Sequence, residues 1–145
     1  MMTIIRLMTD RDIEQVSKIE NETFSMPWSK DAFREFLKRK DTIYIVAEVN
    51  NEIVGYCGLW NIVQEGNINN FAVNKQYRKK HIGFEMLTKL IEIGNEQRIN
   101  AYTLEVRQSN VAAIRLYHKI GFREDGIRKN FYESPREDAI IMWYR

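Results

Sequence analysis

Two ionisable side chains in the C-terminal third of the chain stand where they could exchange protons with a substrate. Glu105 lies near the end of the apolar segment AYTLEV, residues 101–106, and Tyr117 lies seven positions after Asn110, two helical turns further on. A carboxylate can accept a proton and a phenol can donate one, which is the pairing that aminolysis of a thioester needs. Spacing alone leaves two alternatives open: a surface ion pair between Glu105 and Arg107, and a core position for Tyr117 with its hydroxyl hydrogen-bonded.

A basic turn precedes the most regular helical pattern of the sequence. Residues 73–83 read VNKQYRKKHIG and place Arg78, Lys79 and Lys80 just before this helix. Helix N-termini present unpaired N–H groups and a positive dipole end, so a turn of this kind suits a phosphate group. A solvated surface turn is the alternative that this segment, taken alone, leaves open.

Metal-binding and thiol side chains are scarce. The chain has two His and one Cys, and these provide no convincing cluster of metal ligands. Cys57 lies in the apolar segment IVGYCGLW and has no second cysteine with which to form a disulfide. We interpret it as a small buried strand residue, because free cysteine is among the most buried residue types.

The N-terminal half predicts two helices and then antiparallel strands. A strand over 3–8 is followed by Thr9 and Asp10, either of which could cap a helix with Ile13, Val16 and Ile19 on one face. Ser29 is the predicted cap of a second helix that carries Phe33, Phe36 and Leu37. Segments 42–49 and 53–60, joined by Asn50-Asn51, predict a β-hairpin, and Gly66-Asn67 introduces a strand over 68–73.

The C-terminal half predicts an alternation of helix and strand. Apolar spacing predicts a helix over 82–97 and a buried strand over 101–106. Asn110 can cap a further helix that stops at Gly121, and two strands over 122–132 and 138–144 close the chain. This order implies an α/β sheet that is antiparallel in its first half and carries helices on both faces.

Length and composition bound the class of protein. The 145 residues fit a single domain over 1–145, and 44% hydrophobic residues are enough for a core. A net charge of only +2 does not indicate direct binding of nucleic acid. The N-terminus has neither a signal-peptide core nor an apolar run long enough to cross a membrane, so we predict a cytoplasmic protein with no membrane partner.

Together the chemical segments resemble the GNAT acetyltransferase superfamily, and the match to its RimI branch, the ribosomal-protein-alanine N-acetyltransferases, runs along nearly the whole chain. The matching segments are FSMPWS (24–29), NFAV (70–73), the turn through Gly83, TLEVR with SN (103–110), AAIRLYHKIGF (112–122), IRKNFY (127–132) and EDAIIM (137–142). Their order and spacing make this resemblance specific.

The resemblance implies a GNAT fold, with a mixed, twisted sheet of about seven strands whose fourth and fifth strands are splayed apart. It implies acetyl-coenzyme A as cosubstrate and no metal. The pantetheine arm would pair with backbone groups of β-segment residues Phe71, Ala72 and Val73, and the turn would hold the pyrophosphate. The remaining coenzyme contacts implied in this way are Arg78, Lys79, Lys80, His81, Ile82, Gly83, Phe84 and Asn110.

The same resemblance implies that Glu105 is the general base and Tyr117 the general acid for the departing thiolate. The acceptor would be the N-terminal segment of a protein, with the N-terminal alanine of a ribosomal protein as the expected substrate. Pro27 and Trp28, together with Phe131 and Tyr132, match the acceptor-side segments of the branch and are the predicted peptide contacts. The alternatives are acetylation of a small amine or a lysine side chain, and a coenzyme-binding module without turnover.

One residue of the turn departs from the superfamily pattern. His81 stands where glycine usually lets the backbone approach phosphate. Histidine tolerates positive φ better than β-branched residues do, so we expect a tolerated substitution in which His81 itself could donate to phosphate.

Overall fold

The computed structural model describes the whole chain, residues 1–145. The elements in chain order are β1 (Ile4–Leu7), α1 (Ile13–Thr23), α2 (Lys30–Lys38), β2 (Thr42–Val49), β3 (Glu52–Ile62), β4 (Glu65–Val73), α3 (Ile82–Glu96), β5 (Ala101–Arg107), α4 (Val111–Ile120), β6 (Arg123–Glu133) and β7 (Arg136–Tyr144). Short 3₁₀ turns at Asp10–Asp12 and Lys75–Tyr77 precede α1 and α3. The predicted order of helices and strands is confirmed.

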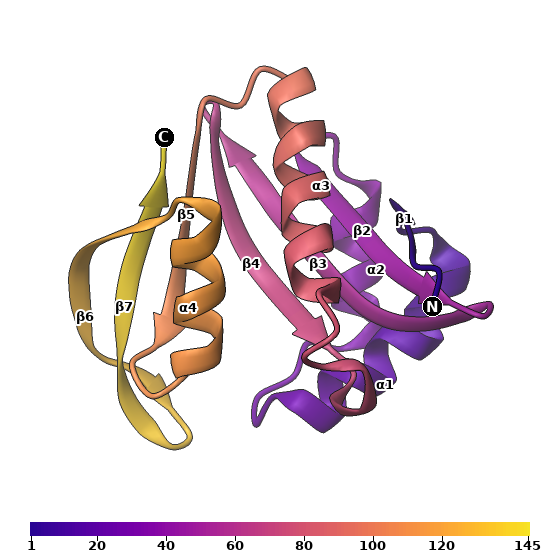
Figure 1. The fold of residues 1–145 in the computed structure, drawn as a ribbon, viewed down its shortest axis with the longest axis horizontal. Coiled ribbons are helices and arrows are strands. Elements are labelled where there is room, and N and C mark those ends of the chain that lie inside the picture. Colours follow the sequence, from indigo (N-terminus) through magenta and orange to yellow (C-terminus); the bar gives the residue numbers. More distant parts are fainter.

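All seven strands form one sheet in the order β1-β2-β3-β4-β5-β7-β6 (Figure 1). Only β4 and β5 are parallel, and their pairing is limited to the register from Glu65↔Ala101 to Asn67↔Thr103. Beyond these residues the two strands diverge, with β4 continuing to Val73 and β5 to Arg107. The predicted mixed sheet with a splayed central pair is therefore confirmed.

A bulge in β4 lies where the strands begin to separate. The register with β3 passes from Leu59↔Ile68 to Gly58↔Asn70, which leaves Asn69 as the extra residue. A bulge bends its strand and increases the local twist, so it helps to turn the rest of β4 away from β5.

Helices cover both faces of the sheet, as predicted (Figure 1). The core beneath α3 and α4 contains Met86 and Leu90 with Ile43 and Ile45 of β2, whereas the core beneath α1 and α2 contains Tyr44 of the same strand. Successive residues of β2 thus point to opposite cores, which is the two-residue period of a strand buried on both faces.

None of the helices combines the length and apolar character needed to span a membrane.

Local sequence signals explain most of the element ends. The Ser29 side chain accepts a hydrogen bond from the Ala32 N–H at 3.1 Å, and Asn110 accepts one from the Ala113 N–H at 3.2 Å, so both predicted caps are confirmed. Asn50-Asn51 also forms the predicted hairpin turn, with φ values of 51° and 64°.

The predicted start of β4 is wrong. Gly66 and Asn67 are strand residues paired with β5, and β4 begins at Glu65. The turn before β4 is made by Val63 and Gln64, which take positive φ values of 49° and 68°. Gly66 has a packing role instead, because a Cβ at this position would lie 2.9 Å from the Tyr102 ring.

Candidate active site

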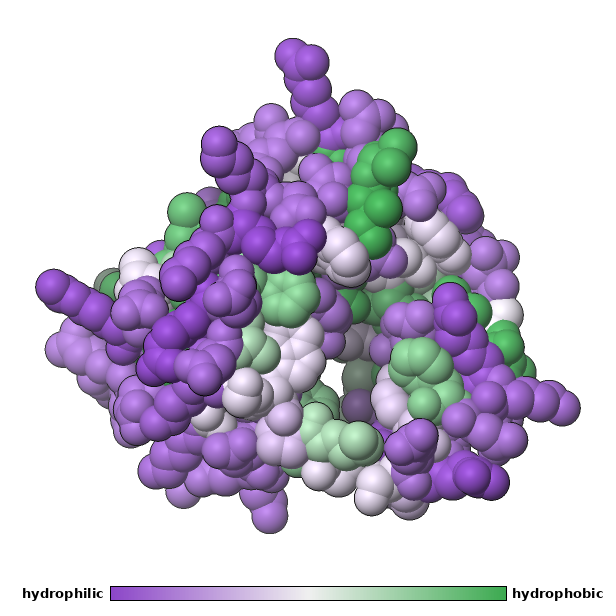
Figure 2. All heavy atoms as spheres, turned by 180° about the vertical axis from the view of Figure 1, so that it is seen from behind, coloured by the Kyte–Doolittle hydropathy of each residue, from purple (hydrophilic) through white to green (hydrophobic).

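Two cavities lie on either side of the gap between β4 and β5. The first, of about 670 Å³, is bounded by the α1–α2 segment, β5 and the β6–β7 hairpin, and we call it the hairpin cavity. The second, of about 720 Å³, is bounded by β4, the start of α3 and one side of α4, and we call it the α3 cavity. Phe71 and Asn110 line both. Figure 2 shows the opening between them from the side of α1 and α2.

Glu105 projects from β5 into the hairpin cavity, with its side chain 33% exposed. One carboxylate oxygen, Oε2, forms an ion pair with Arg128 Nε at 3.1 Å. The alternative of an ion pair with Arg107 is wrong, because the Arg107 guanidinium pairs with Glu137 at 3.2 Å. The Oε1 atom of Glu105 has no ion-pair or hydrogen-bond partner in the structure and remains able to accept a proton.

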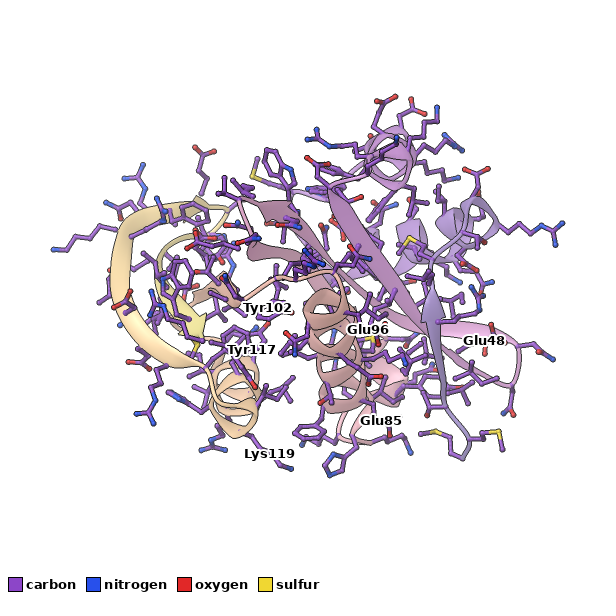
Figure 3. All side chains as sticks on the ribbon, turned by 90° about the horizontal axis from the view of Figure 1, so that it is seen from above. Glu48, Glu85, Glu96, Tyr102, Tyr117 and Lys119 are labelled. Carbon is purple, nitrogen blue, oxygen red and sulfur yellow. The ribbon has the colours of Figure 1, made fainter.

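Tyr117 projects from α4 toward the sheet and lines the same cavity (Figure 3). Its ring is only 6% exposed and packs edge-on against Phe71, with the ring centroids 5.9 Å apart. The alternative of a core position is borne out for the ring, which belongs to the core beneath α3 and α4, but the hydroxyl has no hydrogen-bond partner within the protein and the residue lines the cavity. Burial raises the pKa of Tyr117 far above its usual value, which keeps the phenol protonated and able to donate.

Three of the four predicted acceptor contacts line the hairpin cavity. These are Trp28, Phe131 and Tyr132, whereas Pro27 lies outside the lining. The Trp28 ring stacks on Phe36 at 4.7 Å between centroids, so it is a fixed wall. Burial, and then the charge of Glu105, raise the pKa of Tyr132 to about 12.

The two walls of this cavity are joined to each other. The Ser25 hydroxyl, on the α1–α2 segment, donates a hydrogen bond to the Ser134 carbonyl at the tip of the β6–β7 hairpin. Arg107 contacts the hairpin in two ways. Its Nη1 donates a hydrogen bond to the Pro135 carbonyl at 2.9 Å, and its guanidinium carbon lies 4.2 Å from the centroid of the Tyr132 ring. The hairpin cavity is therefore bridged by a hydrogen bond between its two walls.

Glu20 is a buried carboxylate in the wall of the hairpin cavity that sequence reasoning missed. It is 2% exposed and accepts hydrogen bonds from the Trp28 N–H at 2.9 Å, from the Tyr56 hydroxyl and from the Asn70 amide at 3.5 Å. Its position in the sequence could have indicated that it is buried, because it lies four residues after Val16 and therefore on the apolar face of α1. Its contacts fix the backbone at Trp28 and so help to shape the cavity wall.

The α3 cavity collects nearly all of the predicted coenzyme contacts. The predicted residues that line it are Phe71, Ala72, Val73, Arg78, Lys79, His81, Ile82, Gly83, Phe84 and Asn110, and Lys80 alone does not. Residues that were not predicted also line it, among them Tyr77, Arg107, Leu116 and Lys119.

The turn before α3 has the backbone conformation that the sequence suggested. His81 takes φ of 68° and Lys79 takes φ of 61°, both in the left-handed region. Arg78 braces the turn by donating from Nε to the Val73 carbonyl at 3.0 Å. A Cβ at Gly83 would lie 3.1 Å from Leu116 and 3.2 Å from Phe71, so glycine here lets α3 approach α4 and β4 closely. Ile82, Gly83 and Phe84 of the first turn of α3 line the cavity, and the N–H groups at the start of a helix have no partner within the helix, as a phosphate site requires.

The two cavities differ in charge. The side chains of Arg78, Lys79, Arg107 and Lys119 line the α3 cavity, and no carboxylate does. The hairpin cavity is lined by Glu20, Glu105 and Glu133, with Arg107 as its one cation. The first environment suits a polyphosphate and the second suits a cationic amine. No group of three or more His, Cys, Asp or Glu side chains is placed to hold a metal ion.

Comparison with known proteins agrees with this fold and these cavities. Residues 13–122 match the family model described as the acetyltransferase (GNAT) family. The chain therefore belongs to the GNAT family of acetyl-coenzyme A-dependent N-acetyltransferases.

Whole-length relatives place the chain in the RimI branch, as the sequence predicted. A Bacillus subtilis (strain 168) protein provisionally named ribosomal protein bS18-alanine N-acetyltransferase is 39% identical over 96% of this chain and 93% of its own length. A Haemophilus influenzae protein with that name is 34% identical over 97% of both chains. The crystal structure of the Escherichia coli ribosomal-protein-S18-alanine N-acetyltransferase has 30% identity and a TM-score of 0.89, covering 98% of this chain and 92% of that one.

Proposed function

We propose that this chain transfers the acetyl group of acetyl-coenzyme A to the N-terminal alanine of ribosomal protein bS18, with residues 1–145 acting as one cytoplasmic catalytic domain. The observation that carries the proposal is the pair of oppositely charged cavities that meet at Phe71 and Asn110, between the splayed strands. The names of the H. influenzae and E. coli relatives supply the acceptor.

Acetyl-coenzyme A is assigned to the α3 cavity. The N–H groups of the turn and of the first residues of α3, with Lys79 and the neighbouring cations, hold the pyrophosphate. The pantetheine arm lies along the part of β4 from Phe71 to Val73, where the side of the strand facing β5 has no sheet partner. Unpaired backbone groups there are available for hydrogen bonds with the amides of the arm.

The acceptor amine is assigned to the hairpin cavity. A protein α-amine has a pKa of about 7.7–8.0, so removing its proton near pH 7 costs only about 1 kcal/mol. Glu105 accepts this proton, directly or through water, on the oxygen that Arg128 does not contact. The neutral nitrogen then attacks the thioester carbonyl, and the Val73 N–H stabilises the negative oxygen of the tetrahedral intermediate.

Collapse of this intermediate breaks the carbon–sulfur bond and leaves the new amide on the acceptor. Tyr117 gives its hydroxyl proton to the departing sulfur, because its phenol is protonated and has no other hydrogen-bond partner. The acceptor nitrogen loses its second proton to water as the amide forms, and proton exchange with water then restores the phenol of Tyr117 and the carboxylate of Glu105. No covalent intermediate on the enzyme is needed.

Two features favour a protein N-terminus over a lysine side chain. The Ser25–Ser134 hydrogen bond joins the two walls of the hairpin cavity, and Trp28 and Phe131 give it apolar walls for the first residues of an extended peptide. A lysine amine has a pKa of about 10.4, so removing its proton near pH 7 costs more free energy than removing the proton of an α-amine. A carboxylate is a weak base for that step.

The test is mass spectrometry of a peptide library incubated with acetyl-coenzyme A. Peptides that begin with alanine should be acetylated at the α-amine, and the same peptides with a blocked N-terminus and a free lysine should not. Equal rates on the two sets would reassign the activity to lysine, and tight binding of coenzyme without transfer to any peptide would indicate a module without turnover.

A further inference from the structure

Glu20 is a carboxylate of the hairpin cavity that is buried and has no cationic partner. Its hydrogen bonds come from three neutral donors, the Trp28 N–H, the Tyr56 hydroxyl and the Asn70 amide. Both of its oxygens accept, as those of an ionised carboxylate do, and no Lys, Arg or His forms an ion pair with it. A charge that is only 2% exposed is costly to keep unless a positive charge comes close to it.

The other charges around this cavity are paired or exposed. Glu105 is paired with Arg128 at 3.1 Å, and Arg107 is paired with a carboxylate of β7 at 3.2 Å. Glu133 is exposed on the β6–β7 hairpin, where water and salt screen its charge. The charge of Glu20 is screened least, because its carboxylate lies in the protein interior. The negative potential inside the cavity therefore comes mainly from Glu20.

Glu20 lies on the opposite side of the cavity from the proposed base. Asn67 and Thr103 are the last residues at which β4 and β5 pair. Beyond them, with the bulge of β4 counted, Asn70 is level with Glu105 across the gap, and both line the hairpin cavity. The Asn70 amide contacts Glu20 at 3.5 Å. A nitrogen bound between the two strands therefore has the base on one side and the buried charge on the other.

We propose that Glu20 determines the charge of the acceptor: it holds the α-amine in the hairpin cavity as an ammonium ion, by electrostatic attraction, before Glu105 removes the proton. This inference rests on the proposed function and adds that the acceptor must be positively charged when it binds. Glu20 acts from behind Asn70 and touches no reacting atom, so it is a positioning residue.

The test is isothermal titration calorimetry of protein saturated with coenzyme A, with two ligands. One is an alanine-initiated peptide from the library, and the other is the same peptide with L-lactic acid in place of the first alanine, which puts a hydroxyl where the ammonium was. At about pH 6.5 the α-amine is almost fully protonated. Wild-type protein should bind the ammonium peptide about tenfold more tightly, the size of a buried charged interaction. Glu20→Gln keeps the side-chain volume and an oxygen for the Trp28 N–H, and it should bring this ratio close to one.

Tyr56→Phe is the matched control, because it removes one hydrogen bond of the same network and leaves the charge of Glu20 in place. It should keep the ratio. Glu133→Gln removes the exposed carboxylate of the cavity and should also keep most of it. A ratio near one in the wild type, a ratio that survives Glu20→Gln, or a ratio lost equally in Tyr56→Phe would each overturn the inference. Circular dichroism of each variant shows that it is folded.

Wild-type protein alone provides a second measurement. The ratio should change little between about 0.05 M and about 0.5 M NaCl, because salt screens a buried charge weakly. A ratio that falls to one in high salt would assign the preference to exposed carboxylates and refute the role of Glu20.

The same experiments separate this inference from the proposed function. A ratio that depends on Glu20 in a protein that acetylates no peptide would support the inference and refute the proposed function. Acetylation of alanine-initiated peptides with a ratio that Glu20→Gln leaves unchanged would refute the inference alone. Failure to bind either ligand would refute both.

Discussion

Substitution of Tyr117 by phenylalanine isolates one atom of the proposed reaction. The ring contacts with Phe71 and Phe122, at 5.9 and 5.8 Å between centroids, are kept, and the lost hydroxyl has no hydrogen-bond partner in the protein. The free energy of unfolding should therefore change by no more than about 0.5 kcal/mol. Turnover should nevertheless fall roughly 100-fold, which corresponds to about 2.7 kcal/mol of transition-state stabilisation.

The assay follows release of the coenzyme thiol at saturating acceptor peptide, and calorimetry gives the affinity for coenzyme A. That affinity should change little, because the effect belongs to proton transfer in the transition state. Tyr144→Phe is the matched control: Tyr144 packs against the same Phe122 ring at 5.5 Å but lines neither cavity. It should retain wild-type turnover.

Two results would refute this assignment of Tyr117. Near wild-type turnover in Tyr117→Phe would mean that water or another group protonates the thiolate. A loss of turnover accompanied by an equal loss of coenzyme affinity or of thermal stability would mean that the hydroxyl has a structural role.

Three further predictions follow from other parts of the structure. Glu105→Gln should lower activity most near pH 7 and recover in part near pH 9, where most of the acceptor amine is already neutral; an unchanged pH–rate profile would exclude Glu105 as the base. Gly94→Ala should destabilise the fold by at least about 1 kcal/mol in urea unfolding, although alanine favours helices, because its Cβ would lie 2.3 Å from the Tyr102 hydroxyl. Burial alone would raise the pKa of Asp12, but hydrogen bonds from Arg6 and Thr9 outweigh it and lower the pKa, so this carboxylate stabilises the fold above about pH 4. The stability lost in Asp12→Asn at pH 7 should accordingly shrink below that pH, and a constant difference in unfolding free energy from pH 7 to 3 would contradict it.

Signals carried by neighbouring residues were readable from the sequence. The caps Ser29 and Asn110, the Asn50-Asn51 turn and the helical stop at Gly121 each depend on one or two residues and their own backbone, and all four are confirmed. The turn at Val63-Gln64 was missed because it has no such local signal. Neither residue is typical of positive φ, and the register between β3 and β4 imposes this conformation on them.

Pairings between distant segments were not readable in this way. Sequence proximity suggested Arg107 as the partner of Glu105, whereas the actual partner is Arg128, next to the irregular stretch of β6 between Arg128 and Tyr132. The burial of Glu20 likewise depends on donors from β3 and β4 that only the folded sheet brings to α1. The positions of Glu105 and Tyr117 in one cavity could be predicted because both come from adjacent segments of the chain, but the ionic partner of Glu105 could not.

The short pairing of β4 with β5 has a consequence for hydrogen exchange. In an antiparallel ladder the N–H groups of a strand point alternately to its two neighbours, so the amides of Ile68–Val73 that point away from β3 have no strand to protect them. They should exchange with deuterium far faster than the β3-facing amides between them, although both sets belong to one central strand. A molecule bound along this edge would slow only the exposed set, so the exchange pattern of a single strand reports whether the gap is occupied.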